Sequence, residues 1–116
     1  MRISIVIPTL NRAGPLQACL EALSVDFPTD AEVIVVSDGG DPQRFPDLSR
    51  FEGRLNLKII HAAHGGPASA RNHGLEQTTG SVVLFLDDDC LPAAGWVGIM
   101  AAAVTQDPPG AVGGKT

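Results

Sequence analysis

Four short runs rich in β-branched and other apolar residues limit the possible folds of this chain more than any other feature. They lie at Ile3–Ile7, Val33–Val36, Leu57–Ile60 and Val82–Leu86. A strand with one face in water alternates apolar and polar residues, whereas a strand covered on both faces is apolar almost throughout. The runs therefore predict a mostly parallel sheet with helices on both faces.

Segments with helical spacing of apolar residues alternate with these runs. We expect helices from Pro15 to about Val25, from Pro67 toward Thr78, and from near Pro92 to the Asp107–Gly110 turn. The stretch 39–53 reads as a loop with one helical turn near Asp47–Phe51, and Ala111–Gly113 resembles the start of another strand. This order is the α/β alternation of a doubly wound sheet.

The 116 residues fit one domain, 1–116, with one ordinary hydrophobic core. Aromatic residues make up only 4% of the chain, so the core must be largely aliphatic. The formal net charge of −5 disfavours binding to nucleic acid or to anionic lipid, which basic surfaces drive. A small polyanionic ligand stays possible, because a metal ion or a helix start can supply local positive charge.

The two cysteines, Cys19 and Cys90, are far apart in sequence and have no histidine at metal-ligand spacing. We expect two reduced thiols and neither a disulfide nor a zinc site. No stretch approaches the roughly 18 apolar residues of a membrane span. The expected location is the cytoplasm, with any attachment at the inner face of a membrane supplied by parts outside this chain.

Polar, charged and glycine residues follow each predicted strand, and we expect the strand interiors to be free of charged groups. In open α/β sheets, ligands bind outside the carboxyl ends of the strands. The residues at these ends are Pro8–Arg12, Ser37–Gly40, His61–Pro67 and Asp87–Asp89. They predict a binding site along one edge of the sheet.

The triple Asp87, Asp88 and Asp89 is the sharpest feature of this edge. Adjacent carboxylates repel one another unless a cation is present. Alternate side chains of an extended chain point the same way, so Asp87 and Asp89 share a side and Asp88 faces away. Oxygen ligands with open positions suit Mg²⁺ or Mn²⁺ held jointly with phosphates. The alternative is a solvated acidic turn, which would leave the neighbouring polar residues unexplained.

Three further features belong to the same edge. Asp38 stands where a base or ribose would lie, although an ordinary Asp-Gly turn explains it equally well. Gly65–Pro67 permits close backbone approach and aims helix N–H groups at an anion. Arg71, one turn into the following helix, can meet a phosphate or one of the aspartates, or simply lie on the helix surface. Of the histidines, His64 is the hardest to dismiss as a mere strand-end residue.

Four segments together resemble family-2 glycosyltransferases of the GT-A fold, over essentially the whole chain. Each is moderately specific alone, but all four occur in the right order and spacing. They are Ser4–Arg12 (SIVIPTLNR), Val35–Gly39 (VVSDG), Gly66–Leu75 (GPASARNHGL) and Leu84–Asp89 (LFLDDD). The resemblance implies a Rossmann-like nucleotide-diphospho-sugar transferase fold.

The resemblance also implies roles for particular residues. A D-x-D motif in that family binds ribose, diphosphate and a divalent metal, either Mn²⁺ or Mg²⁺. By position, Asp89 would be the principal metal ligand and Asp87 the first acid of the motif. The nucleotide-binding set would be Thr9, Leu10, Arg12, Asp38, Arg71 and Asp88.

Two small departures and one large one separate this chain from the family pattern. Ser37 and Cys90 stand where the family often has acidic residues. Family members also continue into an acceptor-binding region, which supplies the general base. No acid here takes that role, because Glu76 and Asp107 lie away from the inferred site edge, so the catalytic residues stay unassigned.

We therefore expect the donor-binding half of an inverting, metal-dependent glycosyltransferase, truncated before its acceptor-binding part and inactive alone. The donor would be a nucleotide-diphosphate sugar, with a UDP-sugar favoured, and the acceptor is a saccharide, lipid or protein. The alternative is a non-catalytic nucleotide-sugar binding or interaction domain. A nucleotidyltransferase is disfavoured, since Pro8–Arg12 is not the glycine-rich basic loop that those enzymes carry.

Overall fold

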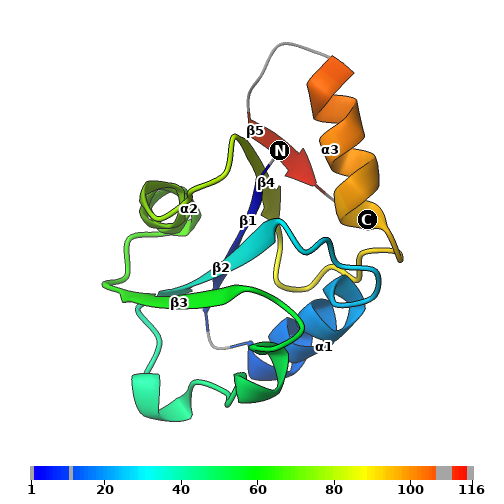
Figure 1. Ribbon diagram of the computed structural model, residues 1–116. Coiled ribbons are helices and arrows are strands. Elements are labelled where there is room, and N and C mark those ends of the chain that lie inside the picture. The colour runs from blue at the N-terminus through cyan, green and yellow to red at the C-terminus, as the bar shows by residue number, and fades with distance from the viewer. Residues whose placement is uncertain (1, 11, 107–110, 115–116) are drawn as a thin grey trace.

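In the computed structural model, a five-stranded parallel sheet lies between helices on both faces (Figure 1). The structure describes residues 2–10, 12–106 and 111–114. The sheet order is β3-β2-β1-β4-β5. Its strands are β1 (Ile3–Thr9), β2 (Ala31–Asp38), β3 (Leu57–Ala62), β4 (Val82–Leu86) and β5 (Ala111–Gly114). The helices are α1 (Ala13–Leu23), α2 (Pro67–Glu76) and α3 (Trp96–Gln106).

The predicted α/β fold class is confirmed, and three strands run further than the predicted apolar runs, with β3 continuing to Ala62. β1 continues to Thr9 and β2 to Asp38, and the pairing continues with them: Thr9 lies opposite Ser37. The polar residues that end these strands are therefore fixed by sheet hydrogen bonds. β5 begins at Ala111, where the sequence resembles a strand start.

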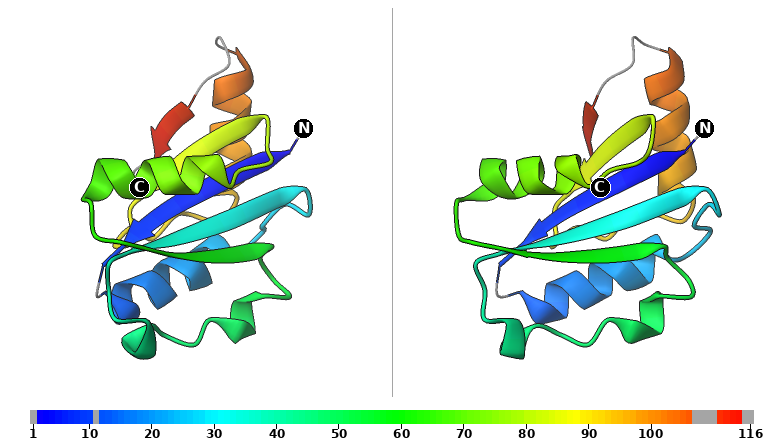
Figure 2. Two further views of the ribbon diagram at one scale, coloured as in Figure 1. Left: turned by 90° about the vertical axis from the view of Figure 1, so that its left-hand side faces the viewer. Right: turned by 60° about the vertical axis from the view of Figure 1, so that its left-hand side comes forward.

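Two apolar layers fill the space between the sheet and its helices (Figure 2). The larger layer joins one face of the sheet to α1, α3 and the 48–55 segment, and includes Leu20, Phe51 and Trp96. The smaller layer joins the other face to α2 and includes Val6 and Val36. Burying aliphatic side chains on both faces explains why the strands are nearly continuously apolar.

Gly74 lets α2 lie close to the sheet. A Cβ placed on this residue would stand 2.4 Å from Val6 Cγ1 and 3.1 Å from Val36 Cγ2. The helix reaches β1, β2 and β3 but leaves Val83 and Phe85 of β4 only half-buried.

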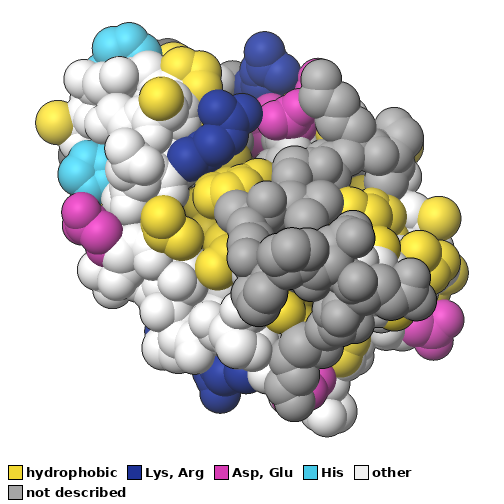
Figure 3. All heavy atoms as spheres, turned by 90° about the horizontal axis from the view of Figure 1, so that it is seen from above, with side chains coloured by type: hydrophobic (Ala, Val, Ile, Leu, Met, Phe, Trp, Pro, Cys, Tyr) yellow, Lys and Arg dark blue, Asp and Glu magenta, His cyan; other side chains and the backbone are white. Residues whose placement is uncertain are grey.

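Figure 3 shows the molecule from the β5 side. Hydrophobic side chains lie at the surface in this view, and basic and acidic side chains lie next to them.

The helix boundaries differ from the sequence expectation by a few residues. α1 starts at Ala13 and stops at Leu23, and α2 stops at Glu76, where Gln77 caps it. α3 starts at Trp96 and not near Pro92, because Gly95 takes a φ of +76° that ends the preceding turn. The 39–53 loop holds two short 3₁₀ helices, η1 (Pro42–Arg44) and η2 (Ser49–Phe51). Asn11 and the Asp107–Gly110 turn lie outside the described residues.

Two charged residues overturn the expectation that the strand interiors carry no charge, Lys58 within β3 and the buried Glu32 within β2. Glu32 of β2 is fully buried near the edge of the sheet where β1 and β2 begin, one residue before the apolar run. Ser4 Oγ donates to Glu32 Oε2 at 2.6 Å, and the Thr79 backbone N–H donates to the same oxygen at 2.7 Å. Lys58 Nζ lies 3.2 Å from Oε1, and Arg2 lies 3.4 Å from it. These contacts join β1, β2, β3 and the turn before β4.

No described helix could cross a membrane, since even the longest have 11 residues where a span needs roughly 20.

Candidate nucleotide-binding site

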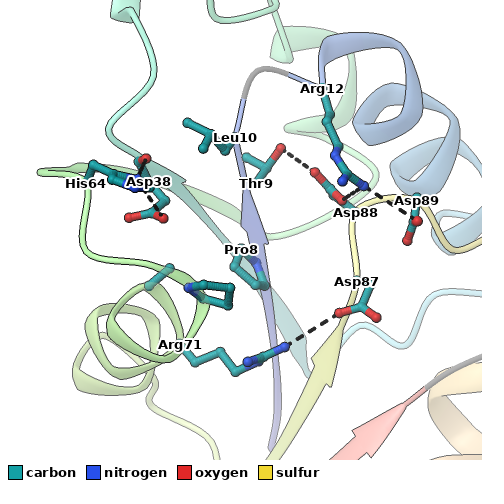
Figure 4. Close-up of a pocket in the computed structure, with 12 residues that line it drawn as sticks. Pro8, Thr9, Leu10, Arg12, Asp38, His64, Arg71, Asp87, Asp88 and Asp89 are labelled. Carbon is teal, nitrogen blue, oxygen red and sulfur yellow. Dashed lines mark hydrogen bonds and ion pairs between the residues drawn. The ribbon is translucent and has the colours of Figure 1, made fainter.

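A pocket of about 430 Å³ opens where β1, β2 and β4 end (Figure 4). All eight site residues proposed from the sequence line it. Its lining is Pro8, Thr9, Leu10, Arg12, Asp38, His64, Pro67, Ala70, Arg71, Asp87, Asp88 and Asp89. The pocket lies at the carboxyl ends of the strands, where the chain order reverses between β1 and β4.

The three aspartates after β4 contact two arginines and Thr9, and Asp88 and Asp89 share Arg12, whose Nη1 lies 3.5 Å from an oxygen of each. Asp87 lies 3.7 Å from Arg71 of α2, and Asp89 lies 3.5 Å from Arg12. Asp88 is almost fully buried and accepts a 2.7 Å hydrogen bond from Thr9 Oγ1. The cations that offset this acidic cluster in the described chain are therefore two arginines of the pocket.

Asp88 has a raised pKa. Burial is the main cause, and the neighbouring Asp89 and Asp87 add to it, while the Thr9 hydrogen bond and Arg12 oppose the shift. Removing a carboxylate from water disfavours its charged form. Its bond to Thr9 holds together the ends of β1 and β4, the two strands that flank the pocket.

Asp87 and Asp89 also face one another. Three atoms lie within 4.8 Å of one another: one carboxylate oxygen of Asp87, one of Asp89, and Cys90 Sγ. A hydrogen-bonded turn produces this arrangement, because the Cys90 N–H donates to the Asp87 carbonyl oxygen at 3.1 Å, and the chain here is not the extended one on which the alternation prediction rested. Carboxylate oxygens suit Mg²⁺ or Mn²⁺, whereas a thiol is a soft ligand that such ions disfavour. The donor set therefore fits a hard divalent cation.

Cys19 lies beneath this cluster and is not among the residues that line the pocket. It is fully buried, and its Sγ lies 3.8 Å from the backbone carbonyl oxygen of Asp87. Burial, with the nearby Cys90 and the three aspartates, raises the pKa of the Cys19 thiol to about 12. Both cysteines are free.

The Asp38 carboxylate is occupied by the chain's own backbone. Gly65 N–H donates to Oδ1 at 2.9 Å, and Gly66 N–H donates to Oδ2 at 3.1 Å. Two N–H groups of the Gly65–Pro67 segment thus face Asp38 as their anion. Asp38 joins the end of β2 to the loop that begins α2, and this pairing of distant residues could not be read from the sequence.

His64 is the pocket residue that sequence reasoning left without a role. Its Nδ1 lies 3.1 Å from the Asp38 backbone oxygen and 3.2 Å from Asp38 Oδ2. Gly39 makes this approach possible, because a Cβ there would lie 2.5 Å from His64 Cβ. His61 is a residue of strand β3 instead, and its ring packs edge-on against the ring of Phe45.

Comparison with known proteins identifies the family. The model of "Glycosyl transferase family 2" matches residues 4–116. The chain belongs to glycosyl transferase family 2. The GT-A fold expected from the sequence is shared by its structural neighbours.

Two relatives represent the family-2 proteins that this chain resembles. It is 37% identical over 93 residues to the poly(ribitol-phosphate) β-N-acetylglucosaminyltransferase TarS of Staphylococcus aureus, covering 77% of this chain and 16% of TarS. It is 34% identical over 99 residues to the glycosyltransferase AglE of Haloferax volcanii, covering 82% of this chain and 33% of AglE. The chain thus spans a third or less of the length of these relatives.

Solved structures of family members superpose on the chain. TarS residues 1–349 in complex with UDP-GlcNAc match with a TM-score of 0.80 at 33% identity, covering 91% of this chain and 32% of that one. The mannosyltransferase PcManGT of Pyrobaculum calidifontis, in complex with GDP-Man and Mn²⁺, matches with a TM-score of 0.74 at 28% identity. That match covers 92% of this chain and 33% of the mannosyltransferase.

Proposed function

We propose that this chain is the donor-binding part of an inverting, metal-dependent glycosyltransferase that takes a nucleotide-diphosphate sugar. The observation that carries the proposal is one pocket that collects all eight predicted residues from β1, β2, α2 and the end of β4. Acidic residues and arginines lie together in it, as binding a metal and a diphosphate requires. Relatives solved with UDP-GlcNAc and with GDP-Man and Mn²⁺ support the same ligand class.

Asp87 and Asp89 are the residues we assign to a divalent metal, Mn²⁺ or Mg²⁺. A bound ion would supply positive charge to a departing nucleoside diphosphate. Arg12 and Arg71 lie beside these carboxylates, and we assign both to the phosphate oxygens, which guanidinium groups bind well. Asp88 holds Thr9 against the pocket wall, so its nucleotide-binding role includes fixing the end of β1.

A UDP-sugar is the donor we favour, because the TarS structures contain UDP-GlcNAc and UDP. We assign Leu10, Asp38 and the residues around them to the nucleoside and leave the sugar acceptor open. The free cysteines agree with a reducing cytoplasm as the site of the reaction.

Transfer itself needs a general base, and every carboxylate that lines the pocket in the described chain already has a partner. Its carboxylates there are Asp38, which backbone N–H groups hold, and the three aspartates paired with Thr9, Arg12 or Arg71. We therefore propose that the chain alone binds the donor and transfers little sugar. Adding the acceptor-side part of a full-length relative and measuring transfer distinguishes this role from a purely non-catalytic binding domain.

Asp89→Ala tests the metal-dependent binding directly. We expect calorimetric titration with UDP and Mn²⁺ to show at least roughly tenfold weaker binding for the variant than for the parent chain. In EDTA the variant should bind UDP no more weakly than the parent, because the substitution frees Arg12 and removes a carboxylate that repels the diphosphate. Glu52→Ala, at an exposed acid outside the pocket, is the matched control and should bind like the parent. Equal affinity of Asp89→Ala and parent in Mn²⁺ would sink the proposal.

A further inference from the structure

A second pocket, of about 340 Å³, opens between α1 and the loop that follows β2. Along β2, Val33 and Val35 pack on the α1 side of the sheet, whereas Ile34 and Val36 pack on the α2 side. Alternation therefore places the next residue, Ser37, on the α1 side, on the opposite face from Asp38. This second pocket, called the α1 pocket below, shares only Thr9 and Arg12 with the nucleotide-binding pocket.

Ser37 brings an unpaired polar group to the α1 pocket. The residue is only 4% exposed, and no described residue is hydrogen-bonded to its hydroxyl. Every side-chain oxygen or nitrogen that is sealed from solvent within the described chain has a hydrogen-bond partner. The unpaired hydroxyl of Ser37 must therefore reach the space of the pocket that it lines. A buried hydroxyl without a partner is costly unless something in that space binds it.

The start of α1 lies at the same pocket and has no cap. Arg12 is the N-cap residue but makes no capping hydrogen bond with its side chain, and the first turn holds no acidic residue. The Leu16 N–H donates to the Arg12 carbonyl oxygen at 2.9 Å, and Pro15 has no N–H. The N–H groups of Ala13 and Gly14 are left, and no described residue accepts from either. Unpaired N–H groups at a helix start favour an anion.

The rest of the lining indicates which kind of anion fits. Leu16, Phe45 and Pro46 give the α1 pocket an apolar wall. Asp41, an exposed acid at the rim, accepts a 3.0 Å hydrogen bond from the Gln43 N–H. A doubly charged phosphate would be repelled by this acid and would lose water against the apolar wall. A carboxylate carries one charge and can be attached to an apolar body, so it suits both parts of the lining.

We propose that the α1 pocket binds a small organic carboxylate. Its carboxylate oxygens accept hydrogen bonds from the Ser37 hydroxyl and from the first N–H groups of α1, and its apolar body packs on Leu16 and Phe45. The Arg12 guanidinium, which also contacts Asp88 and Asp89, adds positive charge at the border of the pocket. The site is separate from the proposed nucleotide binding and does not depend on it.

Benzoate is the probe, and it is titrated into the chain without metal or nucleotide while amide NMR spectra are recorded. The signals of Ala13, Gly14 and Ser37 should shift in a saturable way. Ser37→Ala should bind benzoate about tenfold more weakly, because a hydrogen bond to a charged group is lost. Ser37→Asp, which places the chain's own carboxylate at the helix start, should not bind benzoate.

Two control variants locate the probe. Ser49→Ala changes an exposed serine outside both pockets, and Arg71→Ala removes a guanidinium that lines only the nucleotide-binding pocket. Both should bind benzoate like the parent. If Arg71→Ala weakened binding as much as Ser37→Ala, benzoate would occupy the nucleotide-binding pocket and the proposal would be wrong. Unchanged signals of Ala13 and Gly14 in the parent would also overturn it. Circular dichroism confirms that each variant is folded.

Two further probes test the class of ligand. Acetate, which lacks an apolar body, should bind the parent several-fold more weakly than benzoate. Inorganic phosphate should bind more weakly still. Tighter binding of phosphate than of benzoate, with the same dependence on Ser37, would show that the pocket does not select a carboxylate.

Discussion

Gly39 shows at the scale of one residue how the turn after β2 shapes the pocket. Its φ is +84°, a region that favours glycine, and a Cβ would stand 2.7 Å from the His64 backbone nitrogen. Gly39→Ala should destabilise the chain by about 1–3 kcal/mol, as calorimetry or urea unfolding would measure. It should also weaken UDP binding several-fold, because the Asp38–His64 pair must shift.

Gly53→Ala is the control for that substitution, since Gly53 has open space around its Cβ position and no positive φ. It should leave nucleotide affinity unchanged. If Gly39→Ala matched Gly53→Ala in both stability and affinity, the close approach to His64 would not matter to the site.

Single residues also show how far the sequence could predict the site. The prediction that Asp87 and Asp89 share a side assumed an extended chain, whereas residues 87–90 form a hydrogen-bonded turn in which Arg12 contacts Asp88 and Asp89 together. The partner of Asp38 depends on the path of a loop that returns more than 20 residues later. Long-range contacts of this kind follow from the tertiary fold, and no local pattern encodes them.

At the scale of elements, the packing of α2 on the sheet depends on a missing side chain. Gly74→Ala gains helix propensity, but its methyl would press on Val6 and Val36 in a closely packed layer. The destabilisation from overpacking should exceed the gain in helix propensity, because both valines are fully buried and lie in strands that cannot move aside easily. We expect a net loss of about 1–2 kcal/mol in the free energy of unfolding, measured by urea denaturation.

Gly98→Ala in α3 is the matched comparison. Nothing lies within 4 Å of the position that its Cβ would take, so only helix propensity changes. This variant should have a free energy of unfolding about 0.5–1 kcal/mol higher than that of the parent. A stabilising effect of both substitutions would contradict the close contact of α2 with the sheet.

Element types were predictable because the apolar runs and helical spacings are strong local signals, whereas the ends of elements were not. β1 and β2 continue into polar residues because their neighbours in the sheet offer hydrogen bonds there. α3 starts late because Gly95 takes a left-handed conformation that no apolar pattern reveals. Boundaries are thus set by pairing and turn geometry more than by hydrophobicity.

At the scale of the whole molecule, Glu32 links the stability of the sheet to pH. Burial alone would raise the pKa of this carboxyl, but hydrogen bonds from Ser4, Thr79 and Lys58 outweigh it and lower the pKa to about 2. A lowered folded-state pKa adds stability above the unfolded-state value of about 4.5. That stability is lost as the pH falls from about 4.5 to 2.

Glu32→Gln should therefore lower the free energy of unfolding by about 3 kcal/mol at pH 7, and this difference from the parent should shrink as the pH approaches 2. Urea unfolding of parent and variant at several pH values measures the difference. Glu76→Gln, at an exposed position on α2, should track the parent throughout. A deficit that stays constant from pH 7 to pH 2 would show that the charge of Glu32 is not what joins these strands.

The central position of β1 has a consequence for how the molecule forms. β1 is the earliest strand in the chain, yet Ile3 pairs on one side with Ala31 and on the other with Val82. During synthesis, one hydrogen-bonding side of β1 must wait until β4 has left the ribosome. Parallel pairings between distant segments also fold slowly, because the chain between them must close first. The pocket therefore forms late, since both strands that border it must be paired before Thr9 can meet Asp88.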